Sequence, residues 1–125
     1  MLQNESSVIV ADNTGANLAT IFRILKGSNA KTAKIGDMVV VAIKESTASA
    51  VVKKGEVSRA IIVRQRKELR RADGSYVRFG DNAVILVSTN DKGETAPVGK
   101  RVFGPVAREL REKFRVITNM AEEVI

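Results

Sequence analysis

The feature that most constrains the fold is a series of short runs rich in Val and Ile, separated by Gly, Asn, Asp and Ser. β-Branched residues favour strands, and the residues between the runs favour turns. Runs at this spacing are typical of an all-β barrel or sandwich built from hairpins. The predicted strands cover residues 7–11, 19–25, 37–44, 57–64, 75–79 and 83–88.

Length and composition fit one domain. The 125 residues are 44% hydrophobic but only 4% aromatic, so the apolar content is mostly Val, Ile and Ala, which again favours strands. The longest apolar runs, 38–43 and 83–87, fall well short of the roughly 18 residues that span a bilayer. The first seven residues, MLQNESS, lack the basic and apolar regions of a signal peptide. We expect a single domain, with no membrane partner, that works where it is made.

The strongest hairpin signal is Asp73-Gly74, because this pair favours the turns that match the twist of strands. The run RQRKELRR, residues 64–71, precedes it and is too long and polar for a core strand. We predict a β-ribbon, about residues 64–78, that projects from the barrel into solvent or into a partner.

The last quarter of the chain changes character. Gly104-Pro105 predicts the start of a helix, because Pro is tolerated at a first helical position. Val106, Leu110 and Phe114 then recur as a buried stripe, and Asn119 is a candidate N-cap for a second helix. The predicted division is therefore a barrel with its ribbon over 1–103 and a helical region over 104–125.

Charged residues follow the same predicted helix. Glu109 and Lys113 have the spacing of a favourable ion pair. Arg108, Arg111 and Arg115 share one face if the helix extends that far.

The side chains that most often carry out catalysis are missing from the sequence. The chain has no Cys and no His, which removes thiolate chemistry, the usual general base and the commonest metal ligand. The stretch VADNTGA, residues 10–16, is similar to the loop of retroviral-type aspartic proteases, but Asn13 stands where that chemistry needs a carboxylate. We interpret it as a turn with Gly15 at its corner. We predict no catalytic residue, no cofactor and no metal, hence no enzyme.

A second near-motif is GETAPVGKR, residues 93–101. A P-loop has four residues between Gly and Gly-Lys, followed by Ser or Thr, whereas this stretch has five and is followed by Arg101. We interpret it as a loop that presents Lys100 and Arg101.

The charge is strongly uneven. The net charge is +7, and residues 59–78 contain seven basic and two acidic residues. Six of the seven are Arg, whose planar fork suits phosphate. With Tyr76 and Phe79 the only nearby aromatics, recognition would rest on RNA shape and phosphates. The predicted footprint comprises Arg59, Arg64, Arg66, Lys67, Arg70, Arg71 and Arg78, extended by Lys53 and Lys54. A solvated charged face, or an adaptor that binds protein through its C-terminal helix and the Lys100-Arg101 loop, is the alternative.

The order of several blocks resembles a known family. Ala60-Ile61-Ile62-Val63, nine residues, Asp73-Gly74, four residues, Phe79, two residues and Asn82 closely resembles the signature of the universal large-subunit ribosomal protein numbered fourteen in the bacterial series. The blocks VADNTGA, IGDMVVVAIKE, VVKKGEV and RVFGPVARELRE agree with it. The resemblance extends over residues 1–125.

This resemblance implies a five-stranded β-barrel with a protruding ribbon and short C-terminal helices. It implies a structural constituent of the large ribosomal subunit that binds large-subunit rRNA and contributes to inter-subunit bridges, where it meets small-subunit rRNA. The implied protein partners are large-subunit proteins nineteen and three and a ribosome-silencing factor. The implied location is the cytoplasmic ribosome, with an organellar ribosome as the alternative.

Position by position, the family's basic ribbon falls on Arg64, Arg66, Lys67, Arg70 and Arg71, and its Lys-Lys-Gly turn on Lys53 and Lys54. The inter-subunit or protein-partner surface falls on Lys100, Arg101, Phe103, Arg108, Arg111 and Arg115. Two departures stand out: Ala30-Lys31-Thr32 replaces the usual Arg-Arg-Tyr, and Glu122 stands where Pro is usual.

Overall fold

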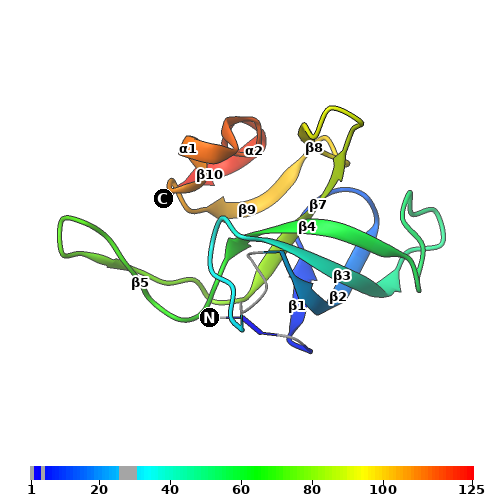
Figure 1. Ribbon diagram of the computed structural model, residues 1–125, viewed down its shortest axis with the longest axis horizontal. Helices are drawn as coiled ribbons and strands as arrows, with labels where there is room; N and C mark the ends of the chain where they lie inside the picture. Colours follow the sequence, from blue (N-terminus) through cyan, green and yellow to red (C-terminus); the bar gives the residue numbers. More distant parts are fainter. Residues whose placement is uncertain (1, 4, 26–30) are drawn as a thin grey trace.

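The computed structural model describes residues 2–3, 5–25 and 31–125. Five strands form the barrel, with neighbours in the order β1-β2-β3-β4-β7, and a parallel pairing of β1 with β7 closes it. This confirms the predicted five-stranded barrel (Figure 1). The strands are β1 Ser7–Val10, β2 Ala16–Ile24, β3 Met38–Ser46, β4 Val57–Arg64 and β7 Ala83–Thr89.

Two hairpins extend from this barrel. A short strand, β8 (Thr95–Pro97), pairs with β7. Between β4 and β7 the chain leaves the barrel as a two-stranded ribbon of β5 (Leu69–Arg70) and β6 (Tyr76–Val77). The ribbon reaches furthest from the barrel of all the elements in Figure 1, as the polar run at 64–71 predicts.

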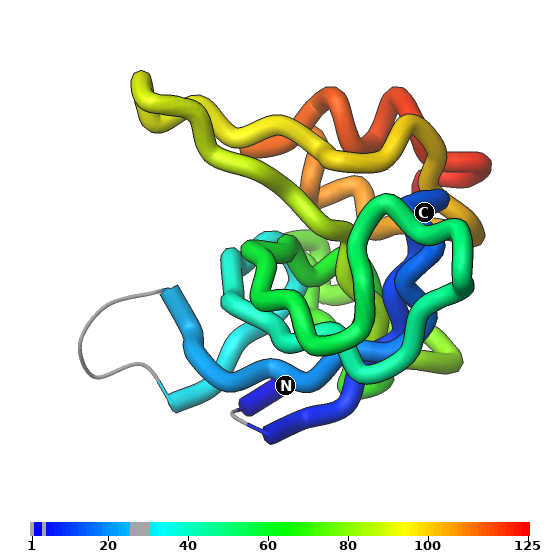
Figure 2. Tube along the Cα trace, turned by 90° about the vertical axis from the view of Figure 1, so that its right-hand side faces the viewer, coloured from blue at the N-terminus to red at the C-terminus, as the bar shows by residue number. Residues whose placement is uncertain are grey.

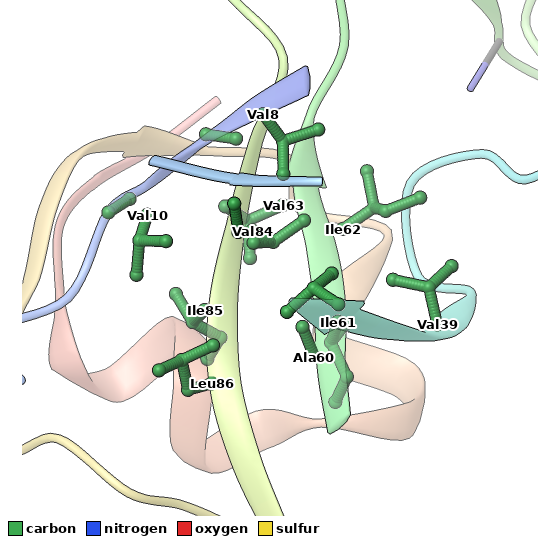
Figure 3. Packing of buried hydrophobic residues seen from close by; sticks show 14 of the residues in the cluster. Val8, Val10, Val39, Ala60, Ile61, Ile62, Val63, Val84, Ile85 and Leu86 are labelled. Atoms are coloured by element: carbon green, nitrogen blue, oxygen red, sulfur yellow. The ribbon is translucent and has the colours of Figure 1, made fainter. Parts of the chain in front are cut away.

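The core follows from the alternation of side chains along the strands. On β3, Val39, Val41 and Ile43 are buried and the residues between them are partly exposed, as expected of a strand with one face inward. The run Ala60–Val63 on β4 is buried throughout, because other elements cover both of its faces. Figure 3 shows these side chains packed with residues of β1 and β7.

The VADNTGA stretch is a turn held by its own side chains. The buried carboxylate of Asp12 accepts bonds from the hydroxyl of Thr14 at 2.6 Å and from the amide of Leu86 on β7 at 2.9 Å. Gly15 has φ +92°, and a Cβ there would lie 2.6 Å from Cβ of Ala50. The position therefore requires Gly both for its backbone angle and for the close approach of the 47–50 loop.

The C-terminal segment contains two short helices, as predicted, but they begin elsewhere. Residues Val102–Val106 form strand β9, so the prediction of a helix starting at Gly104-Pro105 is wrong. Gly104 has φ +81°, which is incompatible with a right-handed helix. The carbonyls of Phe103 and Pro105 instead accept hydrogen bonds from Arg64 on β4.

The helices are α1 Leu110–Lys113 and α2 Arg115–Met120. A non-helical residue, Phe114, separates them with φ −136°, so the predicted continuous stripe is interrupted. A second helix after Asn119 is also wrong, because Ala121–Val124 form strand β10, which pairs in parallel with β9. Glu122 accepts a bond from the amide of Gly104 at 3.1 Å.

The C-terminal elements cover the outer face of the barrel beside the β7–β8 hairpin (Figure 2). Ile61 of β4 and Val87 of β7 line one small cavity together with Phe114 and Ile117, which explains why β4 is buried on both faces. Among the described residues, no helix is long and apolar enough to cross a membrane, and no group of acidic side chains is placed to hold a metal ion.

Candidate nucleic-acid interface

The tip of the ribbon is a tight turn at 71–75. Gly74 takes φ +89°, and the amide of Arg71 donates to the carbonyl of Ser75 at 2.9 Å. Asp73 fixes the turn, because its Oδ1 accepts bonds from the Ser75 amide at 3.0 Å and from the Ser75 hydroxyl at 2.6 Å. The hydrogen bond from the Ser75 side chain is the main reason that the pKa of Asp73 lies below its usual value.

Four of the predicted basic residues are exposed on the ribbon: Arg66, Lys67, Arg70 and Arg78. The backbone at Arg66 is anchored, because the Arg66 amide donates to the side-chain oxygen of Asn82 at 2.9 Å. The side-chain Nε of Arg66 donates to the carbonyl of Gly80 at 3.0 Å. Tyr76 is exposed beside them, whereas Phe79 packs against the core. The ribbon therefore presents cations and one aromatic ring on a fixed backbone.

Arg71 is turned inward from this surface. Its guanidinium forms an ion pair with Glu109 in which Nε and Oε1 are 2.5 Å apart. Its Nη2 also donates to the carbonyl of Ile125 at 2.6 Å. Glu109 is thus paired with the ribbon, and Arg71 joins the ribbon to the C-terminal segment.

Arg64 does not belong to the exposed set. It is only 7% exposed and pairs with Asp81, with Nε 2.8 Å from Oδ1. Because its hydrogen-bonding groups are used inside the protein, we leave Arg64 out of the footprint and assign it to the attachment of β9.

Lys53, Lys54 and Arg59 lie away from the ribbon. The two lysines occupy the loop before β4, and the ribbon leaves from the other end of this strand, roughly 25 Å away for eight extended residues. Figure 1 shows the two loops at opposite ends of the long axis. Lys53 donates to the carbonyl of Ala48 and Arg59 to the hydroxyl of Thr89. The residues predicted to bind rRNA therefore occupy two separate regions.

The Lys100-Arg101 loop is held by Asn13, a contact that the sequence does not predict. The Asn13 side-chain oxygen accepts bonds from the amide of Lys100 at 2.8 Å and that of Arg101 at 3.3 Å. Both basic side chains are exposed, and Phe103 is 46% exposed nearby in the chain. The spacing of 87 residues between Asn13 and Lys100 explains why no local signal reveals the contact.

Arg108, Arg111 and Arg115 lie in one groove with the ribbon. This groove has a volume of about 740 Å³ and is lined by Arg70 and Arg71 on one side and by these three residues on the other. The family resemblance had placed them on a separate surface for inter-subunit or protein-partner contacts. Lys34, which was not predicted as a site residue, lines the same groove.

Of the family-specific departures, Ala30 lies outside the described residues, and Lys31 and Thr32 are exposed.

A comparison with protein families matches the whole chain. Residues 1–125 match the family described as Ribosomal protein L14p/L23e.

Proposed function

The chain belongs to the ribosomal protein L14p/L23e family, and from this premise we propose that its basic ribbon binds large-subunit rRNA. Membership makes it a structural constituent of the large ribosomal subunit, acting in translation, and not an enzyme. The proposal specifies which surface of the protein contacts the RNA and which interactions that surface makes.

The observation that carries the proposal is the exposure of Arg66, Lys67, Arg70 and Arg78 on a ribbon whose backbone is fixed at both ends. A fixed backbone means that little conformational freedom is lost when these side chains bind. Guanidinium groups donate paired hydrogen bonds to phosphate oxygens. The ribbon would therefore neutralise phosphates and hold the local geometry of a folded RNA.

Lys53 and Lys54 offer a second RNA contact at the other end of β4. Because the barrel between the two regions is closed and densely packed, it would set their separation. A rigid spacing of two basic sites favours a folded RNA over a flexible strand.

The Lys100-Arg101 loop with Phe103 is the proposed surface for inter-subunit bridges and protein partners. It presents the exposed Arg101 and the exposed ring of Phe103 beside Lys100, and Arg and Phe are both enriched in protein interfaces. Small-subunit rRNA, large-subunit proteins nineteen and three, and a ribosome-silencing factor are the proposed partners. The proposed compartment is the cytoplasm, with an organelle as the alternative that cell fractionation distinguishes.

The test is incorporation of a tagged chain into large subunits, followed by sedimentation. The variant R66A/K67A should incorporate poorly, whereas K44A/K92A, which removes the same charge from exposed residues off the ribbon, should incorporate normally. Equal incorporation of the two variants would show that the ribbon is not an RNA anchor.

A further inference from the structure

The ribbon and the C-terminal helices enclose a groove that is rich in unpaired cations. Six basic and three acidic residues line it, so three positive charges remain uncompensated. The basic residues come from three parts of the chain: Lys34, Arg70 and Arg71, and Arg108, Arg111 and Arg115. Only the fold brings them together.

The acidic residues are largely engaged. Glu109 is paired with Arg71, and Asp73 accepts two bonds from Ser75. Among the described residues, by contrast, the guanidinium groups of Arg70, Arg108, Arg111 and Arg115 form no hydrogen bond or ion pair with a protein group, although the charge of Arg108 helps to lower the pKa of Asp73. Four guanidinium groups held around one groove repel one another, and a bound polyanion would reduce this electrostatic repulsion.

The Arg71–Glu109 pair and the bond from Arg71 to Ile125 connect the two walls. This connection lies in the groove itself, since both members of the pair line it. The walls are therefore held at a set separation before any ligand arrives, which lowers the entropic cost of binding.

We propose that this groove binds one strand of RNA through its phosphodiester backbone, with Arg70 on one wall and Arg108, Arg111 and Arg115 on the other. The proposal rests on the proposed RNA-binding function and extends it from the ribbon to the C-terminal helices. Continuity favours RNA over an acidic peptide, because Arg66 and Lys67 lie on the same ribbon just before the residues that line the groove.

The experiment measures binding of the full chain to a fluorescent 12-residue oligouridylate over a range of salt concentrations. The variant R108A/R111A should bind at least about fivefold more weakly than the control K44A/K92A. Its salt dependence should also be shallower by about 1.4, since each phosphate contact to a single strand contributes about 0.7 to the slope. Equal affinities and slopes for the two variants would overturn the proposal.

A crosslink locates the strand independently. Because the chain has no cysteine, Ala72→Cys gives one attachment point for a photocrosslinker in the groove, and Asp91→Cys gives a control in an exposed loop away from the proposed RNA contacts. Crosslinking of oligouridylate from position 72 and not from position 91, abolished by R108A/R111A, supports the proposal. Capture of polyglutamate but not oligouridylate from position 72 overturns it in favour of an acidic protein segment.

The two pairs of variants distinguish a failure of the groove proposal from a failure of the ribbon proposal. If R66A/K67A blocks incorporation but R108A/R111A matches its control in both assays, only the groove proposal fails. If R66A/K67A incorporates as well as its control, the ribbon proposal fails irrespective of the groove.

Discussion

Arg64 and Asp81 form a paired contact at the base of the ribbon, with Nε 2.8 Å from Oδ1 and Nη2 3.3 Å from Oδ2. The third nitrogen of the guanidinium, Nη1, donates to the carbonyls of Phe103 and Pro105. One side chain of β4 thus holds the strand that leads into the C-terminal helices, and a residue that resembles an RNA contact in sequence is part of the scaffold.

Replacing Arg64 with Ala should therefore lower the free energy of unfolding by about 3 kcal/mol, because Asp81 and two carbonyls lose their partner. Urea denaturation measures this change. The control is Arg70→Ala on the exposed ribbon, which should change stability by less than about 0.5 kcal/mol. Similar losses for both variants would contradict the scaffold role of Arg64.

Gly15→Ala should destabilise the protein by about 3 kcal/mol or more, from positive φ and from the clash with Ala50. Gly55 is a matched control, since its φ is +91° but nothing lies within 4 Å of an added Cβ. Gly55→Ala should cost only about 1 kcal/mol. Thermal and urea unfolding of the two variants separate the effect of backbone strain from that of packing. Equal losses of unfolding free energy would show that the contact with Ala50 does not matter.

Asn13→Ala should release the Lys100-Arg101 loop. The amides of Lys100 and Arg101 should exchange hydrogen about fivefold faster, as expected for a lost hydrogen bond of about 1 kcal/mol. The control is Asn90→Ala, because Asn90 accepts bonds from the amides of Lys92 and Glu94 in the neighbouring hairpin. Exchange should rise there and not at residues 100–101. Unchanged exchange at Lys100 in Asn13→Ala would contradict the assigned contact.

The barrel could be predicted from the sequence because its strands are determined locally. In β3, residues 38–43 form a continuous apolar run rich in Val, and the run 57–64 coincides with the observed bounds of β4. Asp73-Gly74 located the ribbon turn because the geometry of that turn depends on the two residues themselves.

The C-terminal segment could not be predicted in the same way. Gly104-Pro105 has the local signature of a helix start, but its conformation depends on Arg64, 40 residues earlier, whose guanidinium binds the carbonyls on either side of Gly104. Similarly, the pairing of Arg71 with Glu109 spans 38 residues. The groove that this pairing organises is a product of tertiary structure, so its residues appear in sequence as two unrelated basic clusters.

Asp73 provides a pH-dependent readout of the ribbon turn. Because its pKa is lowered by hydrogen bonds from Ser75, the ionised form stabilises the turn. That stabilisation is fully present above the pKa of the unfolded chain and is lost as the pH falls through the lower pKa of the folded state. Ser75→Ala should raise the pKa of Asp73 toward its ordinary value in an NMR titration of the carboxyl carbon. An unchanged pKa would show that Ser75 is not the cause.

The most direct test of the central claim is the salt dependence of binding between the intact chain and large-subunit rRNA. If the exposed cations of the ribbon and its neighbouring loops neutralise about six phosphates, the logarithm of affinity should fall against the logarithm of salt concentration with a slope of roughly −4 to −5. R66A/K67A should make the slope shallower than in K44A/K92A. A slope near zero for the unaltered chain would contradict the claim that it holds rRNA through its phosphates.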